Sequence, residues 1–105
     1  MRAGAGESAF AALAERFGGE PGVEPGTGFG SAPGLRVEGK IFAMLPYGEL
    51  VVKLPAERCQ ALVEAGAARP FVSGKRTMRE WVVIKTGDSG ARAELAGEAL
   101  AYVRG

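Results

Sequence analysis

The stretch 34–54, GLRVEGKIFAMLPYGELVVKL, constrains the fold of this chain more than any other part of the sequence. It is rich in Val, Ile, Phe and Leu, which suit pleated and half-buried strands, and it is broken at Glu38-Gly39 and at Tyr47-Gly48. Glycine supplies the positive φ that tight hairpin turns require. The stretch therefore predicts two consecutive β-hairpins, that is, three antiparallel strands joined by short turns.

The side chains that point into the core depend on the length of each turn. A two-residue turn at 47–48 pairs Ala43 with Val52. In the first hairpin, a two-residue turn would put Arg36 on the inner face, whereas a three-residue loop over 38–40 would not. We favour the longer loop, because burying an unpaired guanidinium costs more than a bulge. The predicted core face then comprises Leu35, Val37, Ile41, Ala43, Leu45, Leu50, Val52 and Leu54.

The opposite face of these strands is predicted to be apolar in its middle and basic at its edge. It carries Phe42, Met44, Val51 and Lys53. A two-layer fold of 105 residues leaves one sheet face partly bare, so this face is a candidate surface for a protein partner or a homodimer. The alternative is that a terminal helix of the same chain covers it.

Helices are expected on both sides of the hairpins. Apolar spacing indicates an amphipathic helix over 7–17. A second helix is expected to have Pro55 at its first position and to end at Gly66, and a third is expected to be capped by Asp88 or Ser89.

The remaining segments predict two more strands and one long loop. Residues 67–72 are expected to form a short edge strand, because Pro70 cannot donate to a sheet ladder, and 78–85 are expected to form a well-buried strand. Residues 1–6 are interpreted as a flexible start, and the Gly/Pro-rich segment 18–33 as a surface loop. The order α-β-β-β-α-β-β-α predicts a two-layer α+β fold with an antiparallel sheet and a single domain over 1–105.

The composition restricts the chemistry of the chain. It has no histidine and one cysteine, Cys59, so a zinc site of the Cys/His type is excluded, and we predict no metal, no cofactor and no catalytic residues. Cys59 is interpreted as a small core residue. No apolar run approaches the roughly 20 residues of a membrane-spanning helix, and no signal peptide opens the chain, so a cytoplasmic location is expected and no membrane association is predicted.

The cluster 26–30, Gly-Thr-Gly-Phe-Gly, resembles a phosphate-binding loop only superficially. No Gly-Lys-Ser/Thr closes it and no helix is expected after it. A small-ligand or enzymatic role for this loop is therefore the weakest functional hypothesis, and the glycines are better interpreted as conformational.

The strongest local charge asymmetry lies in the predicted hairpin 69–85. Five cations face one carboxylate there, Glu80, although the net charge of the whole chain is only +1. Such a hairpin can bind phosphates as a basic wing, or it can be a solvated turn. The candidate nucleic-acid or anion contacts are Arg69, Lys75, Arg76, Arg79 and Lys85.

Four segments of the chain carry a family resemblance. The runs GLRVEGKIFAML, ELVVKLPAERCQALVEAGAARPF, MREWVVI and EALAYV resemble the TfoX/Sxy N-terminal domain and the related MmcQ/YjbR group. The likeness spans roughly 23–103 and implies a two-layer α+β fold similar to secretion chaperones. It supplies no catalytic residues.

The resemblance has modest implications for function. TfoX-type proteins are regulators of competence gene expression, and YjbR-like proteins have been compared with a double-wing DNA-binding motif. We therefore expect a non-enzymatic regulatory or protein-interaction module of TfoX type, with a nucleic-acid-binding module as the alternative. A competence role is not assigned, because the helical second domain of many TfoX-type proteins is missing from this sequence.

Overall fold

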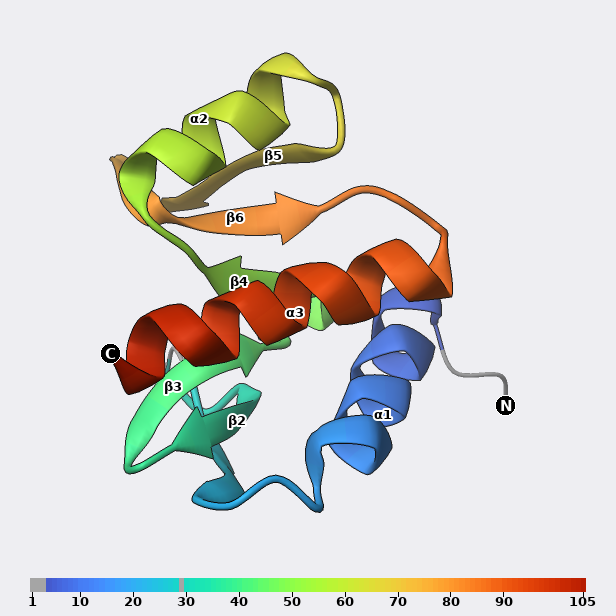
Figure 1. The fold of residues 1–105 in the computed structure, drawn as a ribbon. Coiled ribbons are helices and arrows are strands. Elements are labelled where there is room, and N and C mark those ends of the chain that lie inside the picture. The colour runs from blue at the N-terminus through green and yellow to red at the C-terminus, as the bar shows by residue number, and fades with distance from the viewer. Residues whose placement is uncertain (1–3, 29) are drawn as a thin grey trace.

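A six-stranded antiparallel sheet with three α-helices makes up the computed structural model, which describes residues 4–28 and 30–105 (Figure 1). The helices are α1 (Ala5–Phe17), α2 (Ala56–Glu64) and α3 (Ser89–Arg104). The strands are β1 (Val23–Thr27), β2 (Pro33–Val37), β3 (Lys40–Met44), β4 (Val51–Lys53), β5 (Ala68–Ser73) and β6 (Arg76–Ile84), in the spatial order β1-β2-β3-β4-β6-β5. The predicted α+β class is confirmed, and the predicted helices and strands occur in the predicted order, with one additional strand, β1.

One strand was not predicted. Strand β1 lies inside the segment 18–33, which the sequence indicated to be an irregular loop, and it pairs with β2. The prediction was wrong there because Gly and Pro disfavour strands only locally, whereas β2 offers an unpaired edge to which Val23–Thr27 can add. Helix α1 begins at Ala5, so the predicted flexible start does not extend to residue 6, and residues 1–3 lie outside the described part.

The first hairpin turn has two residues rather than the predicted three. Glu38 and Gly39 both have positive φ, 52° and 83°, and Val37 pairs directly with Lys40. The irregularity lies instead within the strands, where the register shifts between Leu35 and Arg36. The expected bulge therefore exists, but it is inside the hairpin and not at its turn.

The bulge at Phe42 decides which side chains enter the core. Leu35 pairs with Ala43 and Arg36 pairs with Ile41, which leaves Phe42 as the extra residue of β3. Phe42 and Ala43 therefore both join the main core, and Ile41 moves to the other face, contrary to the prediction. Leu35 is buried as predicted, and Arg36 instead forms an ion pair with Glu24 at the sheet edge.

The second turn follows the predicted register. Tyr47 and Gly48 both have positive φ within a short 3-10 segment (Pro46–Gly48), and Ala43 pairs with Val52. The turn and the register depend on local residues, so the sequence was sufficient to predict both.

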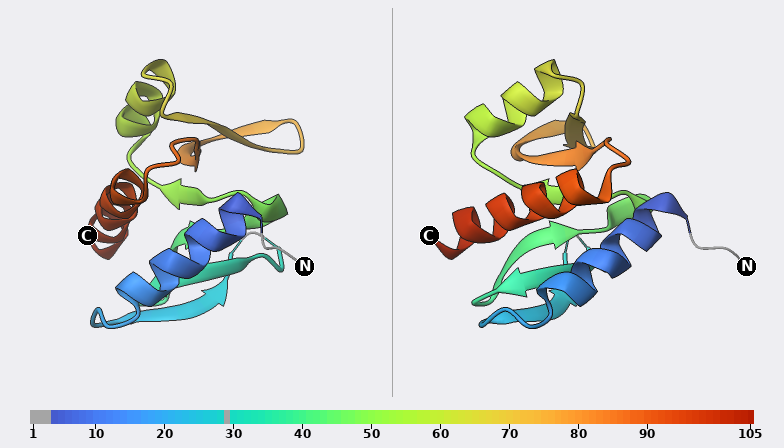
Figure 2. Two further views of the ribbon diagram at one scale, coloured as in Figure 1. Left: turned by 90° about the vertical axis from the view of Figure 1, so that its right-hand side faces the viewer. Right: turned by 45° about the vertical axis from the view of Figure 1, so that its right-hand side comes forward.

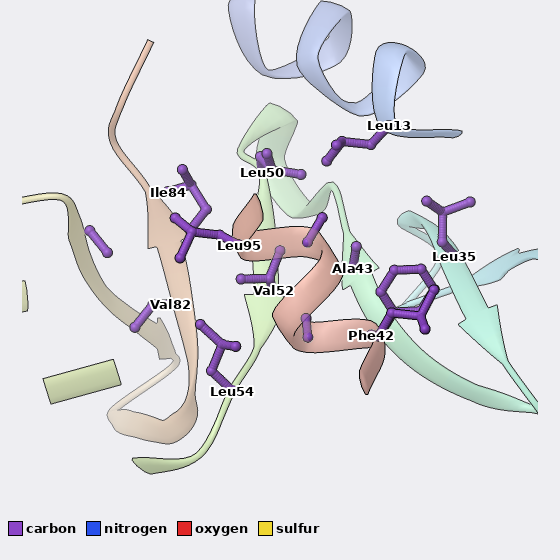
Figure 3. Packing of buried hydrophobic residues seen from close by; sticks show 14 of the residues in the cluster. Leu13, Leu35, Phe42, Ala43, Leu50, Val52, Leu54, Val82, Ile84 and Leu95 are labelled. Carbon is purple, nitrogen blue, oxygen red and sulfur yellow. The ribbon is translucent and has the colours of Figure 1, made fainter. Parts of the chain in front are cut away.

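The main core lies between the sheet and all three helices. Figure 2 shows α1 and α3 beside the strands in two further views, and Figure 3 shows the side chains between them. Phe17 of α1 meets Phe42 edge-on, with ring centroids 6.2 Å apart. The labelled residues in Figure 3 are Leu13, Leu35, Phe42, Ala43, Leu50, Val52, Leu54, Val82, Ile84 and Leu95.

The predicted partner surface is largely internal. Phe42, Met44 and Val51 are 0%, 2% and 0% exposed, respectively, so the chain itself buries them. Met44 and Val51 form a second, smaller cluster with Phe71 and Val83. The proposal of an exposed apolar partner face on these strands is therefore wrong, because the bulge turns Phe42 inward and the clusters enclose the rest.

Close packing between α1 and the second turn gives a first prediction. A Cβ added at Gly6 would overlap the Gly48 carbonyl oxygen, whereas one added at Gly97 of α3 would have only Phe17 Cζ nearby, at 4.0 Å. We expect Gly6→Ala to lower the free energy of unfolding by about 1–3 kcal/mol, because α1 must move away. Gly97→Ala should raise it by about 0.5–1 kcal/mol, because alanine reduces backbone entropy in the unfolded chain. Urea denaturation measures both, and a stabilising Gly6→Ala would contradict this packing.

Candidate functional site

The β5–β6 hairpin carries the candidate site, and its shape follows from an irregular register. Ser73 pairs with Arg76 across a two-residue turn, and Phe71 pairs with Met78. The next pair joins Pro70 to Val82, so residues 79–81 have no partner in β5. Pro70 has no N–H, which suits an edge strand with an interrupted ladder. The interruption bends β6 and sets the outer part of the hairpin apart from the sheet.

Strand β4 supports the other side of β6 at this point. Lys53 pairs with Trp81, and the Leu54 N–H donates to the Glu80 carbonyl oxygen at 3.0 Å. The Lys53 ammonium lies 5.5 Å from the centroid of the Trp81 ring, a cation–π contact. The register thus places a lysine and a tryptophan side by side where the hairpin leaves the sheet.

A surface hollow of about 610 Å³ lies at this bend. Its basic side chains are Lys53, Arg76 and Arg79, and its one carboxylate belongs to Glu80. The whole lining comprises Lys53, Arg76, Thr77, Met78, Arg79, Glu80 and Trp81. We call these seven residues the hairpin hollow. Three cations and an aromatic ring therefore share one concave surface.

The cations of the hairpin hollow differ in their partners from four arginines elsewhere in the chain. Arg36, Arg58, Arg69 and Arg104 each form an ion pair with a glutamate. Within residues 4–28 and 30–105, no carboxylate pairs with Arg76, Arg79 or Lys53. These side chains are therefore available to an external anion.

The one carboxylate of the hairpin hollow is held by α3. The Tyr102 hydroxyl donates to Glu80 Oε1 at 2.8 Å, and this hydrogen bond raises the pKa of Tyr102. The bond fixes Glu80 on the side toward α3. It is the single negative charge against three positive ones in the lining.

The five predicted basic contacts do not form one group. Arg76 and Arg79 lie in the hairpin hollow and Lys75 lies in the adjoining turn. Arg69 and Lys85 line a separate hollow of about 330 Å³ with Glu49, which pairs with Arg69. At about 3.3 Å per residue, Lys85 is roughly 25–30 Å along the strand from Arg76.

Two residues of the hairpin hollow were assigned other roles from the sequence. Lys53 was grouped with the apolar partner face, and Trp81 was interpreted as part of a buried strand. The pairing of Lys53 with Trp81 brings them together. The side-chain alternation of β4 could have shown that Lys53 lies on the same face as Val51. The pairing of β4 with β6, which brings Lys53 to Trp81, could not be derived from local patterns.

Cys59 lies beside a second hollow, between α2 and β6, which has a volume of about 470 Å³. Its side chain is 4% exposed and its Sγ donates to the Leu54 carbonyl oxygen at 3.5 Å, while burial raises the pKa of the thiol. Cys59 is thus a core residue, as predicted.

The burial of Cys59 predicts low thiol reactivity. At pH 8, iodoacetamide should alkylate the native protein at least ~100-fold more slowly than the urea-unfolded chain, because only an accessible thiolate reacts. Mass spectrometry over time measures both rates. Equal rates would show that the α2–β6 packing opens readily.

The glycine cluster 26–30 is not built as a phosphate loop. Gly26 and Thr27 belong to β1, Phe29 lies outside the described residues, and a Cβ at Gly26 would meet the Arg36 side chain. The glycine thus makes room for Arg36. The neighbouring hollow of about 510 Å³ has no charged side chain among its described lining residues: Gly30, Ser31, Ala32, Pro33, Leu45, Pro46 and Tyr47.

Two searches of the described residues concern other kinds of site. Residues 4–28 and 30–105 contain no group of three or more His, Cys, Asp or Glu side chains that could hold a metal ion. In the same residues, no helix has the length and apolar character needed to cross a membrane.

The fold and the hairpin together define a small α+β domain with a curved antiparallel sheet and a basic β-hairpin. The YjbR family model matches residues 19–101, which is most of the chain, and the protein belongs to the YjbR family. This confirms the YjbR part of the resemblance, while the narrower TfoX assignment stays a prediction. Comparison with curated proteins and with solved structures gave no match.

Proposed function

We propose that this YjbR-family protein is a non-enzymatic nucleic-acid-binding module that contacts phosphates through the outer part of the β5–β6 hairpin. The observation that supports the proposal most strongly is the hairpin hollow, where Lys53, Arg76 and Arg79 share a lining with Trp81 and have no carboxylate partner in the described part of the chain. Lys75 in the hairpin turn adds a fourth cation beside it.

This proposal reverses the order of the two sequence-based hypotheses. The regulatory or protein-interaction module was favoured partly because Phe42, Met44 and Val51 were expected on an open face. The chain buries all three, so that support is gone. The basic hairpin, by contrast, keeps three of its five predicted cations together. A regulatory role and a cytoplasmic location remain compatible parts of the proposal.

The electrostatics set the expected strength of binding. A net charge of +1 gives no long-range attraction to nucleic acid, so affinity must come from the few local cations. We expect dissociation constants on the order of 10⁻⁴–10⁻⁶ M near physiological salt, the range of sequence-independent binding, and tighter binding at low salt.

A titration followed by NMR tests the location of the site. On addition of a 12-nucleotide oligonucleotide at low salt, amide shifts should change at Lys53 and at 75–81. The amides of Arg69 and Lys85 serve as internal controls, because these residues line the other hollow. The proposal is overturned if no shifts change at low salt, or if the changes cluster away from the hairpin.

A further inference from the structure

We infer that the hairpin hollow takes single-stranded nucleic acid, with one base stacked on Trp81 and the flanking phosphates held by Arg76, Arg79 and Lys53. This inference rests on the proposed function and specifies its ligand. It follows from the position of the aromatic ring, from the shape of the hollow and from the arrangement of charge.

Trp81 is a partly exposed ring on a rigid support. Its backbone is paired with Lys53 in β4, and its side chain packs against the cluster formed by Met44, Val51, Phe71 and Val83. An indole fixed in this way loses little side-chain entropy when a base stacks on it, and every base presents a π-face.

The Trp81 ring borders the hairpin hollow and already has a cation on one side. Lys53 Nζ lies 5.5 Å from the ring centroid, so a cation occupies this side of the indole in the free protein. An incoming nucleotide supplies both a base for the ring and a phosphate for the ammonium. Binding would therefore replace the Lys53–Trp81 contact with two contacts, a base stacked on Trp81 and a phosphate paired with Lys53.

The composition of the hollow also favours a strand whose bases are exposed. A duplex keeps its base faces inside the stack, so it offers phosphates, sugars and base edges to this surface but no base face. Trp81 would then have no base on which to stack. Along β6, Arg76 and Arg79 alternate with Met78 and Trp81, which matches the alternation of phosphate and base along a single strand.

The remaining carboxylate is compatible with this ligand. The Tyr102 hydroxyl donates to Glu80 Oε1, and within residues 4–28 and 30–105 no side chain donates to Oε2. A base that carries an exocyclic amino group can donate to such an oxygen. The charge in the hollow remains positive, since three cations oppose one carboxylate.

The test compares strands and exploits the single tryptophan of the chain. Fluorescence anisotropy should show a labelled 12-nucleotide dT strand binding at least ~5-fold more tightly than a duplex of the same length at equal low salt. Because a stacked base quenches indole emission, the intrinsic fluorescence of Trp81 should fall on addition of the strand and change little with the duplex.

Two variants separate stacking from a structural effect. Trp81→Leu should weaken binding of the strand by roughly 5- to 100-fold and leave duplex binding unchanged. Trp81→Phe keeps an aromatic ring in the second cluster and should give an intermediate loss, which guards against a misfolded Leu variant.

The outcomes distinguish this inference from the proposed function. Equal affinities for strand and duplex, together with no effect of either Trp81 variant, would overturn the single-strand inference and leave the phosphate-binding module standing. Absence of binding to both ligands at low salt would overturn both.

Discussion

Replacing Phe42 with alanine should lower the free energy of unfolding by about 3–5 kcal/mol, the largest stability effect that we expect from a single substitution in this chain. Phe42 is 0% exposed, and its ring meets Phe17 edge-on at 6.2 Å between centroids. The substitution removes a large buried side chain and leaves a cavity between β3, α1 and α3. Urea denaturation at constant protein concentration measures the loss.

The control for Phe42→Ala is Val72→Thr, which keeps a β-branched side chain at a position that is 50% exposed. It should change the free energy of unfolding by no more than about 0.5 kcal/mol. A Phe42→Ala protein with unchanged stability would contradict the inward position of Phe42. If the unmodified protein self-associated in sizing experiments and Phe42→Ala abolished that association, the sequence-based prediction of a partner surface at Phe42 would be correct after all.

The double variant Arg76→Glu/Arg79→Glu should weaken binding to a single strand at low salt by roughly 100-fold. It removes two of the three cations of the hairpin hollow and places two repulsive charges beside the phosphates. Both positions lie in the outer part of the hairpin, so the core should be unaffected. Anisotropy titrations at one fixed salt concentration measure the change.

A matched control distinguishes local contacts from the effect of net charge. Arg16→Glu/Lys85→Glu changes the net charge by the same amount, but Arg16 lies in α1 and Lys85 lies beyond the far end of β6. With both double variants measured at about 0.1 M salt, where the Debye length is about 10 Å, we expect less than a ~3-fold loss for this pair, because exposed charges farther than that from the ligand are largely screened. Equal losses for the two double variants would show that the hairpin is not the binding surface.

The parts of the fold that could be predicted are those set by local signals. Asp88 caps α3 by accepting a hydrogen bond from the Ala91 N–H at 2.9 Å. Gly66 follows α2 with φ of 79°, and the Ala67 N–H donates to the Leu62 carbonyl oxygen, so a standard glycine cap ends the helix. Pro70 correctly indicated that β5 lies at the sheet edge.

The bulge at Phe42 could not be predicted, because it depends on contacts between distant parts of the chain. From the local sequence, any strand register that keeps Arg36 out of the core satisfies the patterning, and a longer turn is the simplest way to obtain such a register. The structure combines a two-residue turn with an extra residue in β3. The choice follows from Phe17 and α3, which pack against Phe42 from far along the sequence.

The candidate site was predicted only in part for a related reason. Counting charges along the sequence found the basic hairpin but could not show that Glu49 pairs with Arg69. Nor could it show that Lys53 lies over Trp81, since that depends on the pairing of β4 with β6. Charge composition thus located the surface, and strand pairing determined which of its residues act together.

The salt dependence of single-strand binding tests the role of the hairpin hollow most directly. With three or four cations displacing counterions, a plot of log Kobs against log salt concentration should have a slope of about −2 to −3 for the unmodified protein. In Arg76→Glu/Arg79→Glu the slope should fall in magnitude by at least ~1.4, which corresponds to two lost phosphate contacts. An equal slope for both proteins, or no measurable binding at low salt, would contradict the assignment of these side chains to phosphate binding.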